Sequence, residues 1–284
     1  MSNPLIEARD AFAAAWPEQR ITLNGRDWGY IDTGTDGPVL ILIPGTLGRG
    51  DIFWQQITAL KDRLRLVAVT YPATGGVEAW AEDLAALMST LGITSASVLG
   101  SSLGGYLAQY FAASHPHRVE TLFAANTLHA VTGITERMPY ALDLDAAPID
   151  DLRAGFGKGL GDWAKAHPDQ ADLVELLLQE VGGRIPELEL RMRLKALKTA
   201  PELPSLSLLP EQRITIESDD DPLIPQPVRA GVRAKVVPAV SYRFAWGGHF
   251  PYAVRPEAYT ALLEQVLDLN VTGPDWGEGE RRAL

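Results

Sequence analysis

Four short apolar segments in the first half of the chain constrain the fold more than any other feature of the sequence. They are rich in Val, Ile, Leu and Ala, and they cover residues 39–43, 66–71, 96–99 and 121–125. None alternates apolar with polar residues, as a strand with one solvent-facing side would. Each is therefore predicted to be a strand that is buried on both faces of a parallel sheet.

Amphipathic stretches separate these segments. Residues 77–91 carry Trp80, Leu84 and Leu87 at helical spacing, and residues 103–114 carry a second apolar stripe. Strands that alternate with helices in this way predict an α/β fold with a mostly parallel sheet flanked by helices. The earlier residues 21–32, with Asn-Gly between two short runs, are predicted to form an antiparallel hairpin at the sheet edge.

The alternation stops after Asn126. Residues 128–210 contain no strand pattern, and helices are predicted at 170–181 and 186–199. The second helix contains two acid–base pairs at i,i+4 spacing, Glu187 with Arg191 and Glu189 with Arg193. Strand patterns resume at 213–216 and 241–246, a last helix is predicted at 256–267, and no regular structure is predicted from residue 271 onward. The sequence thus predicts one α/β core, residues 1–127 and 211–284, interrupted by a helical insertion, residues 128–210.

Composition excludes several function classes. The 284 residues include no cysteine, which excludes thiol catalysis, iron–sulfur clusters and disulfide frameworks. The net charge of −11 argues against a nucleic-acid partner, because such binding needs a basic surface. No apolar run approaches the length of a membrane span, and the first residues lack the pattern of a signal peptide. We therefore expect a cytoplasmic globular protein.

The strongest chemical motif is Gly100-Ser101-Ser102-Leu103-Gly104, which lies between a predicted strand and a predicted helix. The pattern G-x-S-x-G places a serine on a strained strand-to-helix turn, where side chains at the flanking positions would clash. Ser102 is therefore the candidate nucleophile, and Ser101, at the variable position, is interpreted as structural.

A serine hydroxyl needs a base to take its proton, and the chain has five histidines. His249 lies in a glycine-bearing loop just after the last predicted strand and is the candidate base. His129 follows the strand at 121–125 and is a candidate for the pocket wall, since the carboxyl ends of parallel strands face the ligand crevice. The other three, His115, His117 and His167, are predicted to lie at the surface.

The third member of a triad should orient the histidine and stabilise its charged form. Three consecutive acids, Asp219, Asp220 and Asp221, follow the strand at 213–216. Adjacent residues seldom converge on one metal ion, so we expect neither a metal nor a cofactor here. Asp221 is the candidate acid, and its neighbours are expected to shape the turn.

An oxyanion produced by attack on a carbonyl needs two preorganised N–H donors. One is predicted to be the N–H of Leu103, directly after the nucleophile at a helix N-terminus. The other is predicted to be the N–H of Thr46, in the loop after the first buried strand. Bulky side chains that are candidates for the pocket wall are Phe53, Trp54, Trp246 and Phe250.

Together these residues resemble the α/β-hydrolase superfamily, and within it the maspardin-like branch. The resemblance includes the order Ser102, Asp221, His249 along the chain, and it covers most of the chain outside the insertion. It implies an α/β-hydrolase fold, a Ser-His-Asp triad, and a helical cap formed by the insertion. Two departures stand out: Pro44 precedes Gly45 where many hydrolases carry histidine, and His249 is present where vertebrate maspardin has asparagine.

The sequence therefore favours a serine hydrolase acting on a carboxylic ester or a related acyl compound through an acyl-enzyme. Two alternatives stay open: other chemistry with the same triad, such as C–C or lactone hydrolysis or perhydrolysis, and a non-catalytic binding or adaptor protein like maspardin. The expected partner is a small ester-like molecule. The natural substrate and the oligomeric state are not specified by any motif.

Overall fold

The computed structural model describes residues 3–277 and 281–283, and it is built on a single twisted sheet. Within the described residues the sheet has nine strands in the order β1-β2-β4-β3-β5-β6-β7-β8-β9. β1–β2 and β2–β4 pair antiparallel, and every later pair is parallel. The strands are β1 Gln19–Leu23, β2 Arg26–Asp32, β3 Val39–Ile43, β4 Arg65–Thr70, β5 Ala96–Ser101, β6 Val119–Ala125, β7 Arg213–Ser218, β8 Val240–Phe244 and β9 Arg281–Ala283.

This arrangement confirms the predicted α/β-hydrolase fold with a mostly parallel sheet. The hairpin of β1 and β2 also forms as predicted, at the sheet edge, and its turn residues Asn24 and Gly25 both have positive φ, 47° and 80°.

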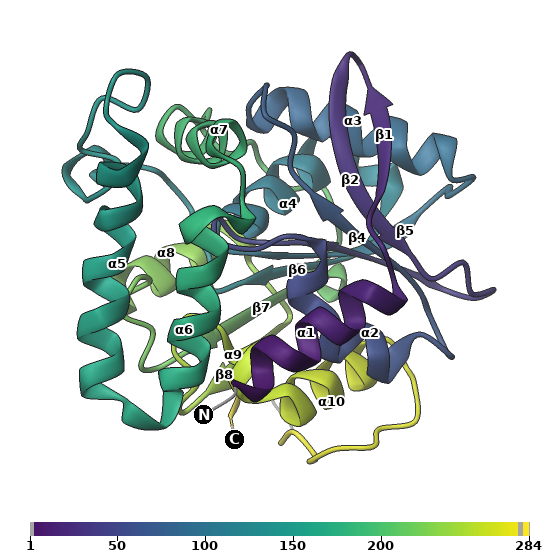
Figure 1. Ribbon diagram of the computed structural model, residues 1–284. Helices are drawn as coiled ribbons and strands as arrows, with labels where there is room; N and C mark the ends of the chain where they lie inside the picture. Colours follow the sequence, from purple (N-terminus) through teal and green to yellow (C-terminus); the bar gives the residue numbers. More distant parts are fainter. Residues whose placement is uncertain (1–2, 278–280, 284) are drawn as a thin grey trace.

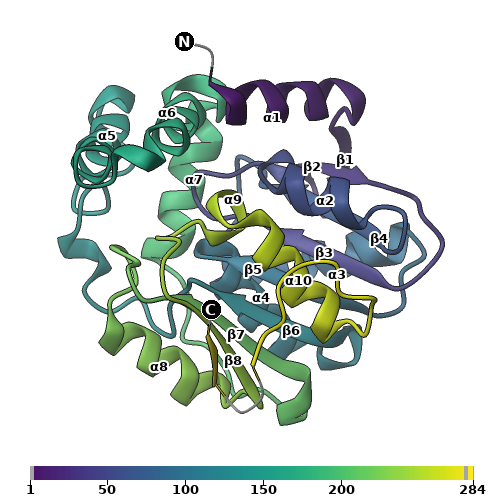
Figure 2. The same cartoon turned by 90° about the horizontal axis from the view of Figure 1, so that it is seen from below.

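Helices cover both faces of the sheet (Figures 1 and 2). They are α1 Pro4–Ala15, α2 Trp54–Leu60, α3 Val77–Thr90, α4 Leu103–Ser114, α5 Ile149–Ala166, α6 Ala171–Gln179, α7 Glu187–Lys198, α8 Gln226–Val236, α9 Pro251–Val254 and α10 Pro256–Val266. The central strands alternate their side chains between two cores. In β3, for example, Leu40 and Leu42 pack toward α2 and α10, whereas Ile41 and Ile43 pack toward α3 and α4. Apolar residues are needed on both sides of such a strand, which is why the sequence shows no polar alternation there.

The segment between β6 and β7, residues 128–210, contains helices and no strand. Its longest helix, α5, was not predicted. Four glycines lie within α5, at positions 155, 157, 159 and 161, and each lowers helix propensity by about 1 kcal/mol relative to alanine. None of the helices in residues 3–277 combines the length and apolarity needed to cross a bilayer.

The prediction of no regular structure from residue 271 onward is wrong in part. Trp276 is buried, and its ring packs edge-on against Tyr242 at 5.1 Å and Phe244 at 5.0 Å. Arg281–Ala283 then forms β9, which pairs with β8. A buried tryptophan fixes this segment although its composition is polar and rich in glycine; residues 278–280 and 284 of the predicted tail lie outside the described residues.

Close backbone contact fixes α4 against the strands that precede the candidate nucleophile. A Cβ atom on Gly104 would lie 2.2 Å from the Ile43 carbonyl oxygen, and one on Gly100 would lie 2.0 Å from the Gly104 carbonyl oxygen. No L side chain fits at these separations, so α4, β3 and β5 meet backbone to backbone. This contact sets the position of the turn between β5 and α4.

The substitution Gly104→Ala tests this contact. Because backbone atoms must move to accept the methyl group, we expect a loss of about 3 kcal/mol in the free energy of unfolding, measured by urea denaturation. The matched control is Gly159→Ala in α5, where a Cβ would meet nothing within 4 Å. The control should gain about 0.5–1 kcal/mol, as alanine does when it replaces glycine in an unstrained helix. Equal stability of the two variants would contradict the close contact.

Candidate active site

Ser102 occupies the turn between β5 and α4 in a strained conformation. Its φ is 55° and its ψ is −119°, a region that non-glycine residues rarely adopt and that costs about 1–3 kcal/mol. Three hydrogen bonds hold the turn: Ser102 N–H to the Ala125 carbonyl at 3.0 Å, and the Tyr106 N–H and Thr127 hydroxyl to the Ser102 carbonyl at 3.0 and 2.6 Å. The side chain is half-buried at the carboxyl edge of the sheet, where the motif predicts it.

His249 and Asp221 are in direct contact, as the triad prediction requires. His249 Nδ1 lies 2.9 Å from Asp221 Oδ2 and 3.1 Å from Oδ1, and both residues are buried. A contact through Nδ1 places Nε2 on the opposite side of the imidazole ring, which is the geometry of a base held by an acid.

The Asp221 carboxylate is held in its charged form. It accepts hydrogen bonds from the backbone N–H groups of Leu223 at 2.9 Å and Ile224 at 3.0 Å, and from the Asn126 side chain at 3.0 Å. Burial, the largest single influence, acts to raise the pKa of Asp221. The charge of protonated His249 and these hydrogen bonds outweigh it, so the pKa lies below its ordinary value.

The neighbouring aspartates have different contacts. Asp220 accepts hydrogen bonds from the N–H groups of Gly247 at 3.3 Å and Gly248 at 2.9 Å, which anchors the loop that carries His249. Asp219 pairs with Arg243 of β8. The three consecutive acids thus have different partners: Asp221 contacts His249, Asp220 binds the loop that carries it, and Asp219 pairs with β8. Within residues 3–277 and 281–283, no three His, Asp or Glu side chains gather as a metal site.

The loop after β3, residues 44–48, packs directly on the candidate nucleophile; we call it the oxyanion loop. A Cβ on Gly45 would lie only 3.1 Å from Ser102 Cβ, and the loop is closed by a hydrogen bond from Gly48 N–H to the Gly45 carbonyl at 3.1 Å. Leu103 is the first residue of α4, so its N–H is one of the four that a helix leaves without an internal partner. The two segments predicted to supply oxyanion donors, through Thr46 and Leu103, therefore meet at Ser102.

Asn126, just after β6, links the nucleophile to the acid. Ala125, its neighbour, accepts the hydrogen bond from Ser102, while the Asn126 side chain donates to Asp221. Since β6 lies between β5 and β7 in the sheet, this single strand end brings the Ser102 turn and the Asp221 loop together.

The aromatic residues predicted to line a pocket are placed in different surroundings. Phe250 lies edge-on against His249, with ring centroids 5.0 Å apart. Phe53 is fully buried against Tyr252, and Trp246 is 47% exposed beneath the Arg255 guanidinium. Of these, Phe250 alone contacts a candidate triad residue in the described structure.

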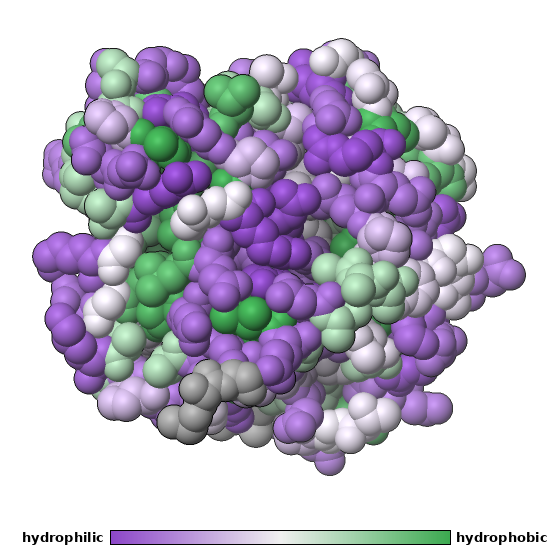
Figure 3. Space-filling model, viewed as in Figure 1, coloured by the Kyte–Doolittle hydropathy of each residue, from purple (hydrophilic) through white to green (hydrophobic). Residues whose placement is uncertain are grey.

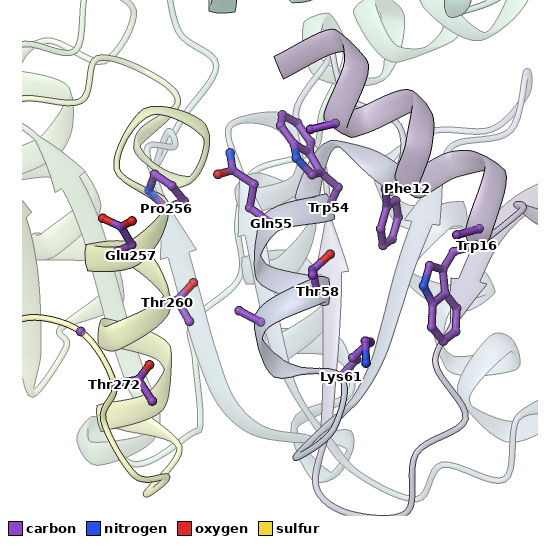
Figure 4. A pocket seen from close by; sticks show the side chains of 14 residues that line it. Phe12, Trp16, Trp54, Gln55, Thr58, Lys61, Pro256, Glu257, Thr260 and Thr272 are labelled. Carbon is purple, nitrogen blue, oxygen red and sulfur yellow. The ribbon is translucent and has the colours of Figure 1, made fainter. Parts of the chain in front are cut away.

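His129 and Trp54 lie elsewhere. The His129 ring packs on Gly231 of α8, where an added Cβ would approach it to 2.1 Å. Trp54 lines a cavity of about 650 Å³ between α1, α2 and α10, together with Phe12, Trp16 and Thr260 (Figure 4). No residue that lines this cavity belongs to the candidate triad or the oxyanion loop.

Three residues of the insertion to which the sequence analysis gave no role in the site contact it. Trp163 of α5 packs on the His249 loop, since a Cβ on Gly248 would lie 2.9 Å from its ring. Tyr140 interacts with the Thr46 side chain, and Arg193 of α7 donates to the Thr46 carbonyl. The predicted ion pair between Glu189 and Arg193 is confirmed at 3.2 Å. Both side chains are buried, which the i,i+4 spacing in the sequence does not indicate.

Figure 3, seen from the side of Figure 1, shows a mainly hydrophilic face, with apolar side chains gathered toward the side where α5 and α6 lie. Leu178 of α6 is among the exposed apolar residues.

The link between Asn126 and Asp221 predicts a pH-dependent contribution to stability. A carboxyl group with a lowered pKa stabilises the folded protein above its unfolded pKa, and this contribution is lost as the pH falls through the folded pKa. Asn126→Ala removes one donor to Asp221. We therefore expect a loss of about 2 kcal/mol at pH 7, part of which disappears as the pH falls below about 4.

Thr127→Val, next along the chain, is the matched control. It removes a hydrogen bond to the neutral Ser102 carbonyl, so its cost should not change with pH. Urea unfolding between pH 7 and pH 3 measures both variants. A pH-independent difference between Asn126→Ala and wild type would refute the link to Asp221.

Comparisons with known proteins agree with this fold. The family described as "alpha/beta hydrolase fold" matches residues 38–256, and the chain therefore belongs to this family. The Magnesium-chelatase 30 kDa subunit of Rhodobacter capsulatus is 28% identical over 281 residues, covering 91% of this chain and 98% of the relative. A protein of Caulobacter segnis named "Putative carbamate hydrolase RutD" is 25% identical over 255 residues, covering 82% of this chain and 92% of the relative.

Among solved structures, a hydrolase from Pseudomonas aeruginosa PA01 superposes with a TM-score of 0.74 at 19% identity, covering 88% of this chain and 98% of that one. This likeness shows the fold. The resemblance to the maspardin-like branch stays a prediction.

Proposed function

We propose that this α/β hydrolase is a serine hydrolase that cleaves a carboxylic ester or a related acyl compound. The observation that carries the proposal is the contact between His249 and Asp221 at 2.9 Å, in a chain whose candidate serine is held in a strained turn against the oxyanion loop. A base, an acid that orients it, and a nucleophile on a rigid turn are the parts that acyl transfer requires.

The proposed reaction has two halves. The Ser102 hydroxyl oxygen attacks the acyl carbon while His249 Nε2 takes its proton, and the N–H groups of Leu103 and Thr46 stabilise the oxyanion. The carbonyl re-forms, the alcohol leaves with the proton from His249, and the acyl group stays on Ser102. Water then gives a proton to His249 Nε2 and attacks the acyl carbon. As the bond to Ser102 breaks, His249 returns that proton to Ser102 Oγ, and the carboxylic acid and the free serine are released.

Asp221 has a specific part in this sequence. Because its pKa is lowered, it stays a carboxylate and stabilises His249 each time the imidazole is protonated. Asn126 and the Leu223 and Ile224 amides keep that carboxylate aimed at Nδ1. The role of Asp221 is therefore orientation and charge stabilisation, without proton transfer to the acid itself.

Two observations bear on the substrate class. Phe250 beside His249 favours an apolar group near the scissile bond. The relative named as a carbamate hydrolase widens the acyl class to carbamates. C–C or lactone hydrolysis and perhydrolysis would use the same triad, and residues 128–210, which we propose as the cap over the core, would select among them. We propose the cytoplasm as the place of the reaction.

Turnover of p-nitrophenyl acetate and butyrate tests the nucleophile. Ser102→Ala should lower kcat/KM by about 10⁴-fold or more, because a triad acts as a unit. The matched control is Ser101→Ala, its buried neighbour on β5, which should stay within about tenfold of wild type. If Ser102→Ala and Ser101→Ala keep equal activity, Ser102 is not the nucleophile.

A second candidate is a non-catalytic binding or adaptor role, as in maspardin. The observation that favours it is the Rhodobacter capsulatus relative, whose name makes it a subunit of magnesium chelatase. Under this proposal Ser102, Asp221 and His249 would be retained without turnover. Wild-type rates equal to those of Ser102→Ala on every ester tried would favour it over the hydrolase.

A further inference from the structure

Arg193, on helix α7 of the insertion, reaches out of its own segment into the oxyanion loop. Its side chain is fully buried. The single nitrogen Nη1 donates to two carbonyls of the loop, that of Thr46 at 3.0 Å and that of Gly48 at 2.7 Å. The guanidinium therefore donates to backbone carbonyls of the oxyanion loop, which packs on the candidate nucleophile, and not to solvent.

We propose that Arg193 is a positioning residue that holds the oxyanion loop in the shape that presents the Thr46 N–H to the substrate. The proposal rests on the proposed hydrolase function and adds to it a requirement: the oxyanion site is complete only when α7 is docked on the core.

The planarity of the peptide group gives the mechanism. In a trans peptide the C=O and the following N–H point in opposite directions, so fixing one fixes the other. The Gly45 carbonyl, which shares a peptide plane with the Thr46 N–H, is held by Gly48 N–H at 3.1 Å. Arg193 holds the next plane through the Thr46 carbonyl, and it holds Gly48 itself through its carbonyl.

Tyr71, just after β4, extends the same restraint to the start of the loop. Its hydroxyl donates to the Pro44 carbonyl at 2.7 Å, and the Arg193 guanidinium lies 5.2 Å from its ring centroid. The carbonyls of Pro44, Thr46 and Gly48 are thus bound by two side chains that contact each other. The Pro44 and Thr46 carbonyls belong to the peptide planes on either side of the Gly45–Thr46 plane, so the plane that carries the Thr46 N–H lies between two restrained neighbours.

The burial of Arg193 is costly, which argues against a role in packing alone. Desolvation lowers its pKa to about 10, still well above neutral pH, so the side chain keeps its charge. Glu189 compensates only in part, at 3.2 Å, and Nε has no hydrogen-bond partner in the described structure. Apolar residues of similar volume often replace both partners of a buried ion pair without loss of stability, so packing alone does not call for a charged pair here.

Arg191, two residues earlier, supplies a matched control. It also donates to two carbonyls, those of Leu144 at 3.0 Å and Ala147 at 2.8 Å, and it also forms an ion pair one turn away, with Glu187. All of these partners belong to the insertion. Losing Arg191 therefore costs the same kinds of contact without touching the oxyanion loop.

The experiment compares R193M, R193K and R191M by two measurements, amide hydrogen exchange of residues 44–49 and steady-state hydrolysis of p-nitrophenyl acetate. R193M should speed exchange of the loop amides by about tenfold or more. It should lower kcat by about 100-fold with KM within about threefold, because the oxyanion exists only in the transition state. R193K, whose ammonium is one bond short of the carbonyls, should fall between R193M and wild type. R191M should leave both measurements close to wild type.

The two measurements separate the possible failures. If R193M matches R191M in loop exchange and in kcat, the positioning role is overturned. If R193M does not fold, R193K decides, and wild-type values in both measurements overturn the proposal. If the wild type shows no turnover beyond Ser102→Ala, the proposed hydrolase function fails, while loop exchange still decides whether Arg193 orders residues 44–48.

Discussion

The backbone contact between α4 and the strands β3 and β5 is the constraint on which the rest of the site depends. Gly100 and Gly104 allow an approach that no side chain would permit, and the chain can make the turn between β5 and α4 only with Ser102 at positive φ. The strain at Ser102 is held by hydrogen bonds to Ala125 and Thr127, at the end of β6. That same strand end carries Asn126, which aims Asp221 at His249. One close packing contact thus positions Ser102, and the end of β6 connects its turn with Asp221 and His249.

The insertion, residues 128–210, contacts the candidate site directly. Trp163 packs on the His249 loop, and Arg193 binds the oxyanion loop, so two helices of the insertion contact two loops of the candidate site. A second set of buried charges ties the insertion to the core: Glu180 pairs with Arg9 of α1, and Arg184 pairs with Asp51 near the oxyanion loop. One segment therefore contacts both the His249 loop and the oxyanion loop.

Much of this was predictable from the sequence, because the strands of a doubly covered sheet must be apolar throughout. The start of α4 at Leu103, the order of Ser102, Asp221 and His249, and the hairpin turn all follow from local patterns. The helix α5 could not be predicted from local patterns, because its four glycines lower the helix propensity of the segment. The burial of Trp276 could not be predicted either, because the surrounding segment is polar. The contact between Arg193 and the oxyanion loop could not be predicted either. An acid and an arginine at i,i+4 spacing give the same sequence pattern whether they face solvent or a loop 147 positions away.

The account's central claim is that Ser102 is a nucleophile activated by His249 and Asp221. Its most direct test is labelling with a fluorophosphonate, followed by peptide mass mapping of the wild type and of His249→Ala. We predict one phosphonyl group per chain, located on Ser102 in the wild type, and a labelling rate lower by about 10³-fold or more in His249→Ala. A wild-type protein that takes up no label, or that carries it on a different serine, would contradict the claim.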